Sequence, residues 1–272
     1  MGFQSKIVPE EILRVEDVTV SFDGFLVLKN LNFSMERGEL RVVIGPNGAG
    51  KTTLLDVITG KIRPAKGRVL FQPQNTSPKS LTTISEEQIA LFGVGRKFQT
   101  PNIFKSLTVL DNLQLAAKAS RRVLTNLARF SRNGSCRIEE ILQTIGLSSK
   151  ANNIAGLLAH GEKQWLELGM VMLQDPELLL IDEPVAGMTP RESEKTGELL
   201  MAMARKHTLL VIEHDMTFVR QIAQRVTVLD EGQILCEGTV EAVQKDPKVI
   251  QVYLGQDRDA DASDRQALSG VR

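Results

Sequence analysis

The chain has 272 residues, of which 42% are hydrophobic and 24% are charged, a balance typical of soluble globular proteins with a sizeable core. This composition excludes a wholly disordered chain, a collagen-like fibre and a coiled coil. Lys plus Arg and Asp plus Glu number 33 each, so no net charge attracts the chain to nucleic acid, and we expect no nucleic-acid partner. The two cysteines fit a reducing cytosol. No apolar run approaches the roughly 18 residues that cross a bilayer, so any membrane role passes through a partner.

The N-terminal part of the chain predicts strands that lead into a glycine-rich loop. Residues 13–22 alternate apolar and polar side chains, the pattern of a half-buried strand, and LNFSM predicts a second strand. The apolar, β-branched run LRVVIG predicts a buried strand, and TTLLDVITG after the loop predicts a helix. Residues 72–88 are polar and contain prolines, which predicts a loop with at most one short helix.

The C-terminal part predicts a helical insertion followed by further strands. In residues 106–166, LTVLDNLQLAAKA and RIEEILQTIG place apolar side chains at helical spacing, with NLARFSRNGSC as a loose connection. ELLLID and HTLLVIEH predict buried strands separated by a helix, and VTVLDEGQILCEG predicts a hairpin. This alternation predicts an α/β fold with a mainly parallel sheet. Residues 256–272 lack any apolar period, so we expect a disordered tail.

The segment GPNGAGKT, residues 45–52, fits the phosphate-binding pattern G-x-x-x-x-G-K-[ST] and lies between a predicted strand and a predicted helix, as that pattern requires. Its glycines let backbone N–H groups point at a phosphate, and the helix adds the positive end of its dipole. We expect Lys51 to neutralise the β- and γ-phosphates and the Thr52 hydroxyl to bind Mg²⁺. The predicted nucleotide-binding residues are those of this segment and the threonine that follows it: Gly45, Pro46, Asn47, Gly48, Ala49, Gly50, Lys51, Thr52 and Thr53.

Two carboxylates, Asp182 and Glu183, follow the apolar run Leu178–Ile181. A buried strand of this kind delivers both carboxylates to the sheet edge where α/β proteins bind ligands. We expect Asp182 to hold Mg²⁺ through its hydration shell, and Glu183 to accept a proton from an attacking water.

Between these two motifs lies LAHGEKQ, residues 158–164, which opens a predicted helix. Here the chain resembles the ATP-binding subunits of ABC transporters, whose signature at this place is L-S-G-G-Q or a close variant. The resemblance covers roughly residues 12–255, and the other landmarks of the family occur in the expected order. They are the aromatic Phe22, a Q-loop at Phe98-Gln99, the signature residues Ala159, His160, Gly161 and Glu162, a D-loop over 184–189, and a switch histidine, His214.

The resemblance implies the architecture of an ABC ATPase, which is an α/β P-loop NTPase core with a mainly parallel sheet, an antiparallel β subdomain and a helical insertion. It divides the chain into an ABC ATPase domain over residues 1–255 and the tail. Within that domain we expect a core with its antiparallel β subdomain over residues 12–105 and 167–255, and a helical subdomain over residues 106–166.

The resemblance also implies roles for single residues that would carry no signal alone. Phe22 is expected to stack on adenine, with Phe25 as the alternative. Gln99 is expected to contact Mg²⁺ and the attacking water, and His214 the γ-phosphate, although a lone Gln is usually a surface residue and a lone His usually a satisfied imidazole. The signature is expected to complete the ATP site of a second ATPase subunit, either an identical copy or a sister subunit.

Four stretches narrow the resemblance to two subgroups of the family. RKFQTPNIFKSLTVLDNLQLA and VIQVYLG resemble the branched-chain amino acid and amide uptake group, while HGEKQWLELGM and DEPVAGMT resemble the urea-transporter subunit. The expected function is therefore ATP hydrolysis that powers uptake of a small polar solute, urea first, with branched-chain amino acids or short amides as the alternative. A soluble non-transport ABC ATPase is less expected, because such proteins usually carry two ATPase units or a long coiled coil, and this chain has neither and a balanced charge. A regulatory nucleotide-binding module without turnover is less expected because Glu183 and His214 are present, although Ala159 leaves it open.

The resemblance implies transmembrane permease subunits as partners and, indirectly, a periplasmic solute-binding protein. The chain is then expected in the cytoplasm, at the inner face of the membrane. The sequence departs from the family pattern at Ala159, where the signature has serine, and at Thr189, where the D-loop has aspartate. We expect Ile103 and Phe104 to help line a groove for a permease helix, and Trp165 to pack within the subdomain.

Overall fold

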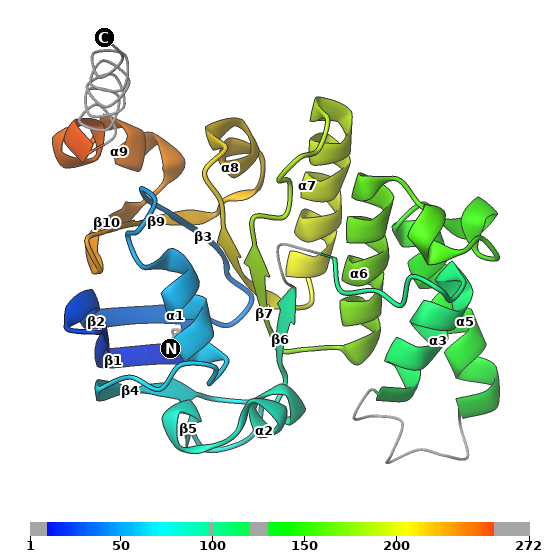
Figure 1. The fold of residues 1–272 in the computed structure, drawn as a ribbon, viewed down its shortest axis with the longest axis horizontal. Helices are drawn as coiled ribbons and strands as arrows, with labels where there is room; N and C mark the ends of the chain where they lie inside the picture. Colours follow the sequence, from blue (N-terminus) through cyan, green and yellow to red (C-terminus); the bar gives the residue numbers. More distant parts are fainter. Residues whose placement is uncertain (1–9, 98–100, 120–129, 253–272) are drawn as a thin grey trace, which may run out of the picture.

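The computed structural model describes residues 10–97, 101–119 and 130–252, arranged as two sheets and a group of helices (Figure 1). Predictions about Gln99 and the tail over 256–272 lie outside the described residues. Among the described residues, no helix is both long and apolar enough to span a bilayer.

The first sheet is antiparallel and has the strand order β2-β1-β4-β5. Its strands are β1 (Glu11–Phe22), β2 (Phe25–Glu36), β4 (Lys66–Phe71) and β5 (Lys79–Ser80). The β1–β2 hairpin turns at Asp23 and Gly24, which both have positive φ, as a two-residue hairpin with the native twist requires. The predicted strand LNFSM is the second half of β2.

The second sheet has the order β10-β9-β3-β8-β7-β6, in which only β10 is antiparallel to its neighbour. Its strands are β3 (Leu40–Ile44), β6 (Val94–Lys97), β7 (Leu178–Asp182), β8 (Thr208–Ile212), β9 (Arg225–Asp230) and β10 (Gln233–Gly238). Every residue of β3, β7 and β8 is buried, because helices or the first sheet cover both faces. The predicted parallel α/β fold is confirmed.

Helices cover the two faces of the second sheet unequally. They are α1 (Lys51–Ile58), α2 (Glu86–Leu91), α3 (Val109–Ala119), α5 (Phe130–Thr144), α6 (His160–Gln174), α7 (Pro190–Ala204), α8 (Met216–Ile222) and α9 (Val240–Lys245). Alternate β3 side chains divide the core: Val43 packs with α1 and the first sheet, whereas Val42 packs with α3, α6 and α7. The phosphate loop and the signature helix therefore lie on opposite faces (Figure 1).

Several elements differ from the predictions: the strands β4 and β6 were not predicted, and the helices α5 and α6 extend beyond the expected limits. Helix α5 begins at Phe130, inside the stretch predicted as a loose connection, because extending a helix already nucleated by the downstream apolar residues adds a hydrogen bond per residue. Helix α6 runs through residue 166, the predicted end of the helical subdomain, and ends at Gln174, where the C-cap Asp175 has the left-handed conformation. Its packing against α3 and α5 continues past residue 166, and the bounds of the helical subdomain stay a prediction.

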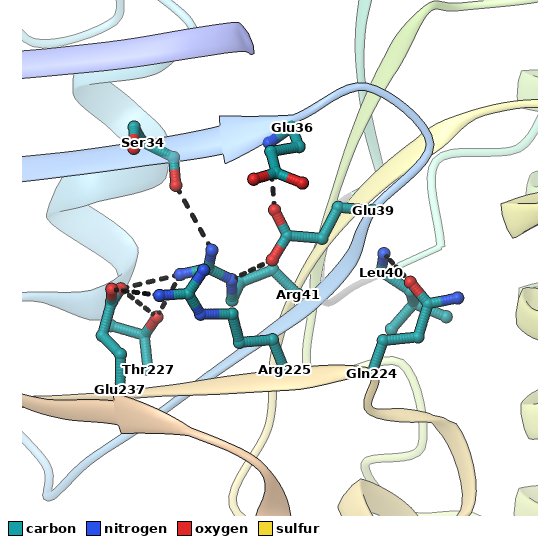
Figure 2. A network of polar contacts seen from close by, with 9 residues as sticks. All are labelled: Ser34, Glu36, Glu39, Leu40, Arg41, Gln224, Arg225, Thr227 and Glu237. Atoms are coloured by element: carbon teal, nitrogen blue, oxygen red, sulfur yellow. Dashed lines mark hydrogen bonds and ion pairs between the residues drawn. The ribbon is translucent and has the colours of Figure 1, made fainter. Parts of the chain in front are cut away.

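A buried arginine joins the two sheets, although the run LRVVIG was predicted as an apolar strand (Figure 2). Arg41, on β3, is 1% exposed and donates to Glu39 at 2.5 Å, Glu237 at 2.7 Å and the Thr227 hydroxyl at 2.8 Å. It also reaches the Ser34 carbonyl of β2 at 3.4 Å. These contacts satisfy a charge that would otherwise be costly to bury.

Candidate functional site

The phosphate-binding loop is shaped by glycines at which no side chain fits. Gly50 is the N-cap of α1 with φ +100°, and a Cβ there would lie 2.7 Å from Leu28 Cδ2 of β2. At Gly45, with φ +152°, a Cβ would lie 2.0 Å from the Leu229 carbonyl oxygen of β9. Strands from both sheets therefore lie so close to the loop that only glycine fits at these two positions.

The other loop residues follow the same path. The Ala49 carbonyl accepts the N–H of Gly232 at 3.0 Å, which ties the loop to the β9–β10 turn. Asn47 and Gly48 are exposed at the tip of the loop. In the first turn of α1, Thr52 is exposed and Thr53 is half-buried, so the Thr52 hydroxyl can reach a ligand bound at the loop.

The first turn of α1 suits an anion. It contains no acidic residue and Gly50 makes no side-chain cap, so its backbone N–H groups are available to a phosphate. Lys51 Nζ donates to the carbonyls of Gly45 at 2.6 Å and Pro46 at 2.8 Å. Burial lowers the pKa of Lys51, an effect that the carboxylates of Glu183 and Asp182 oppose. The ammonium is thus held over the loop and within electrostatic reach of those carboxylates.

The structure brings Glu183 and His214 together, as the sequence predicted. Glu183 follows β7 with φ +43°, and its N–H donates to the Ile212 carbonyl of β8 at 3.0 Å. His214 follows β8, and its Nδ1 atom lies 3.7 Å from Glu183 Oε1. The imidazole is 65% exposed, whereas the Glu183 side chain is 26% exposed. Parallel neighbouring strands place both residues at one sheet edge, where both can face a bound phosphate.

Asp182, the last residue of β7, takes part in a buried charge cluster that the sequence did not reveal. Arg96 of β6 lies 3.7 Å from Asp182 and 2.5 Å from Asp56 of α1. Burial raises the pKa of Asp182, and the Arg96 guanidinium opposes that rise. Arg96 therefore favours the ionised Asp182 that a cation ligand must be.

Glu213, for which the sequence predicted no role, precedes His214 and organises the loops of the site. Its side chain is 1% exposed and accepts the backbone N–H groups of His214 at 2.8 Å, Asp215 at 3.2 Å and Val185 at 3.3 Å. Burial raises the pKa of Glu213, and these three N–H donors oppose the rise. One buried carboxylate thus holds both the segment after β8 and the segment after β7. Its only sequence signal was an acidic residue at the end of a buried strand.

The signature residues form the first turn of α6 and contact the D-loop of the same chain. His160 Nε2 lies 3.2 Å from the Ala186 carbonyl oxygen. Gly161 is buried, and a Cβ there would lie 2.5 Å from Glu192 Oε1. The Glu162 carboxylate accepts the N–H of Ala159 at 3.2 Å and pairs with Lys150 at 2.6 Å.

Thr189 has a structural role at the position where the family has aspartate. It is the N-cap of α7, and its hydroxyl accepts the N–H of Glu192 while the Glu192 carboxylate accepts the N–H of Thr189 at 2.9 Å. This reciprocal capping box fixes the start of α7. The substitution therefore keeps a helix cap and removes a charge from the exposed D-loop.

The remaining predicted residues do not belong to the group formed by the phosphate loop, Asp182, Glu183 and His214. Phe22 is 45% exposed and Phe25 is 80% exposed at the tip of the hairpin whose second strand abuts Gly50, so stacking by Phe22 stays a prediction. Ile103 is buried in the core, so the expectation that it lines a groove is wrong, whereas Phe104 is 54% exposed. Trp165 packs as predicted, with Nε1 donating to the Thr196 hydroxyl at 3.0 Å.

A curled glycine loop with its lysine, facing a carboxylate pair and a histidine at the edge of a parallel sheet, defines a P-loop ATPase. Comparisons with known proteins narrow this class. Residues 28–186 match the family model described as ABC transporter, and residues 233–259 match the model described as branched-chain amino acid ATP-binding cassette transporter.

Relatives are similar in sequence to this chain along nearly its whole length. The high-affinity branched-chain amino acid transport ATP-binding protein LivG of Escherichia coli (strain K12) is 35% identical and covers 91% of this chain and 99% of its own. BraF of Pseudomonas aeruginosa, which has the same description, is 34% identical and covers 90% of this chain and 98% of its own. The crystal structure of the ADP conformation of MJ1267, an ATP-binding cassette of an ABC transporter, has a TM-score of 0.76 at 31% identity, covering 90% and 99%.

The chain belongs to the ABC transporter family, as an ATP-binding subunit of its branched-chain amino acid group. The predicted ATPase activity and the ABC ATPase fold are confirmed at this level. The narrower resemblance to a urea-transporter subunit finds no support among these relatives.

Proposed function

We propose that the chain hydrolyses ATP to drive uptake of branched-chain amino acids or short amides through permease subunits. The observation that carries this proposal is the match of residues 233–259 to the branched-chain amino acid model, together with the descriptions of LivG and BraF. It favours the alternative solute class over urea, which the run over residues 160–170 suggested first. Urea stays the second candidate because of that run.

The chemistry assigned to the site begins with phosphate binding. The α1 N–H groups and Lys51 would bind the β- and γ-phosphates of ATP, and Phe22 would stack on the adenine. The oxygens of Thr52, Asp182 and Gln99 are the hard ligands that Mg²⁺ prefers, and the Asp182 carboxylate beside Arg96 suits that role. When bound, Mg²⁺ supplies positive charge that offsets the charge of the transferring phosphoryl group.

Proton transfer is assigned to Glu183. Its side chain is only partly exposed and lies 3.7 Å from the His214 imidazole, so a water between Glu183 and a γ-phosphate could lose its proton to this carboxylate. His214, which is largely exposed, would contact the γ-phosphate. Glu213 keeps His214 in place through the backbone rather than through the imidazole.

The signature belongs to a second site in this proposal. Because α6 and α1 lie on opposite faces of the sheet, the first turn of α6 cannot bind the phosphate held by α1 of the same chain. It would bind the γ-phosphate on a second ATPase subunit, with free N–H groups of the α6 first turn as donors. ATP would then bridge two subunits, and loss of the γ-phosphate would release them.

An exposed apolar patch next to the signature helix suits the permease. Phe104, Ile154 and Leu157 are 54%, 39% and 84% exposed, and their two segments lie side by side because Gly156 N–H donates to the Lys105 carbonyl at 2.9 Å. Large apolar side chains gathered on a surface are typical of interaction sites. Docking here would hold the chain at the inner face of the membrane, with a periplasmic solute-binding protein on the other side.

Uptake in cells that lack this chain tests the solute. Labelled leucine, propionamide and urea are supplied separately, and the chain is restored either as wild type or as Glu183→Gln. We expect wild type, but not Glu183→Gln, to restore leucine or amide uptake. Restoration of urea uptake alone would establish urea instead, and restoration of none would contradict an importer of this group.

A further inference from the structure

The guanidinium of Arg96, on β6, is divided between two carboxylates. Its Nη1 atom donates to Asp56 Oδ1 of α1 at 2.5 Å, while its Nη2 atom lies 3.7 Å from Asp182 Oδ2 at the end of β7. The first distance is that of a short hydrogen bond, whereas the second is too long for one. The cation therefore lies beside Asp182 but is bonded to Asp56.

Helix α1 and its C-cap hold the guanidinium from two positions. Asp56 and Thr59 are three residues apart, so they lie on the same face of the helix end, and the Thr59 hydroxyl accepts Arg96 Nη1 at 3.3 Å. The side chains of Arg96 and Asp56 are only 7% and 11% exposed, so solvent screens their attraction little. The C-terminal end of α1 thus fixes where the cation lies.

The sheet geometry places Arg96 within reach of Asp182. Arg96 is in register with Leu180 of β7, which packs in the core on the α1 side of the sheet. Because side chains alternate along a strand, Asp182, two residues after Leu180, points to that same side. A movement of about 1 Å would shorten the contact between Arg96 and Asp182 to the length of a charge-assisted hydrogen bond.

That movement would change what Asp182 can bind. A carboxylate oxygen bonded to a guanidinium has fewer lone pairs left for Mg²⁺ or for its bound waters. While Asp56 accepts Nη1, Arg96 favours the ionised Asp182 without being bonded to it. If Asp56 lost its charge, the buried guanidinium would need another anionic partner, and Asp182 lies beside it.

We propose that Asp56 is a positioning residue that holds the Arg96 guanidinium back from Asp182, and so keeps Asp182 available to Mg²⁺. This inference rests on the role proposed above for Asp182. The first turn of α1 is the one proposed to bind the phosphates, so a single helix would position both the nucleotide and the carboxylate that serves its cation.

The test measures binding of a fluorescent ATP analogue to the full chain during titration with Mg²⁺, with thermal unfolding measured in parallel. In Asp56→Asn we expect the Mg²⁺ concentration at half effect to rise about tenfold, as a charge-assisted hydrogen bond from Arg96 would cause. Affinity without Mg²⁺ should stay within about twofold of wild type, because the first turn of α1 is untouched. An unchanged Mg²⁺ midpoint in the folded variant would overturn the proposal.

The double variant Asp56→Asn/Arg96→Met distinguishes restraint of Arg96 from a merely structural role of Asp56. It removes the competing guanidinium as well, so we expect the Mg²⁺ midpoint to return to within about threefold of wild type. If Asp56 only stabilised the fold, loss of a second buried side chain would leave the double variant at least as impaired as Asp56→Asn. That result would overturn the proposal.

Thr59→Val is a milder variant of nearly the same size. It removes the second acceptor for Nη1, so the Mg²⁺ midpoint should rise about twofold, the effect of one weaker hydrogen bond, and no rise would count against the proposal.

Glu237→Gln is the matched control, because it removes a carboxylate bonded to another buried arginine, Arg41, elsewhere in the same sheet. It should lower the thermal midpoint without moving the Mg²⁺ midpoint. A shift as large as that of Asp56→Asn would show a general effect of lost ion pairs and overturn the proposal.

Asp182→Asn separates this inference from the proposed function. If Asp182→Asn leaves the Mg²⁺ midpoint unchanged, the role proposed for Asp182 fails, and the inference fails with it. If Asp182→Asn raises the midpoint while Asp56→Asn does not, only the role of Asp56 is overturned.

Discussion

The N-termini of α1 and α6 are both proposed to bind phosphate, yet they are built differently. The first turn of α1 has a glycine cap, no acidic residue and Lys51 folded over the loop. The first turn of α6 contains Glu162, whose carboxylate accepts the N–H of Ala159 and is paired with Lys150. The first turn of α1 therefore leaves its N–H groups available to an anion, whereas the first turn of α6 already satisfies one of its own donors with the Glu162 carboxylate.

In the proposed dimer, this difference would give the two helix N-termini unequal roles toward the γ-phosphate of one ATP. An anion gains from the free N–H groups and dipole of α1 without displacing anything. At α6 it competes with an internal carboxylate. We therefore expect phosphate binding at α6 to be weaker than at α1, so that loss of the γ-phosphate would release the second subunit.

The largest effect is expected from Glu183→Gln, which tests whether both helix ends bind one nucleotide. General-base catalysis contributes about 10²- to 10⁴-fold, so hydrolysis should fall by that factor. Unhydrolysed ATP should then hold two subunits together. Size measurement by light scattering with ATP and Mg²⁺ checks this, and a species that stays monomeric would contradict the shared nucleotide.

The next largest effect is expected when alanine replaces one glycine at the N-terminus of α1 and, separately, one at the N-terminus of α6. Gly50→Ala forces a left-handed residue and places a Cβ 3.0 Å from the Val27 carbonyl oxygen, so we expect about 2–4 kcal/mol of lost stability and failed ATP binding. Gly161→Ala meets only the end of the flexible Glu192 side chain and should cost about 1 kcal/mol, the value of the α7 cap that it disturbs. Chemical denaturation checks both variants, and equal losses would count against this distinction.

A smaller effect is expected from Ala159→Ser, which adds a hydroxyl to the weaker end. The residue has N-cap geometry with φ −61° and ψ 163°, so serine should stabilise α6 by about 0.5–2 kcal/mol. A hydroxyl bonded to the γ-phosphate is worth about 1.5–3 kcal/mol, so hydrolysis in the assembled transporter should be equal or faster. A clear fall in phosphate release would show that residue 159 does not face the nucleotide.

The smallest effect is expected from Glu162→Gln, which removes the negative charge from the first turn of α6. Charge at a helix terminus is worth about 0.3–1 kcal/mol, so ATP-dependent association of subunits should strengthen about two- to fivefold. Lys150→Met is the matched control, because it leaves the Glu162 carboxylate without its ion pair and should weaken association. Effects of the same sign in both variants would contradict the competition between this carboxylate and phosphate.

Much of the fold and part of the site could be predicted because the relevant residues are contiguous. The phosphate loop needs only a strand, its glycines and Lys51 in succession, and Asp182-Glu183 follow a run that is buried for its whole length. Helix bounds were less predictable: α5 starts early and α6 crosses the expected subdomain boundary, because packing and helix propagation override local composition.

The sequence by itself determined the buried strands β3, β7 and β8, the curled loop and the placement of the candidate residues at strand ends, because each depends on the local pattern of one short segment. It did not reveal the strands β4 and β6. Only the tertiary structure decided which charges meet. Arg96 with Asp182, Glu213 with three backbone N–H groups, and Glu167 with Lys97 and Asn102 join segments far apart in the chain. A charged side chain can be buried only where partners from several elements converge, and that convergence exists only once the sheet and its helices have packed.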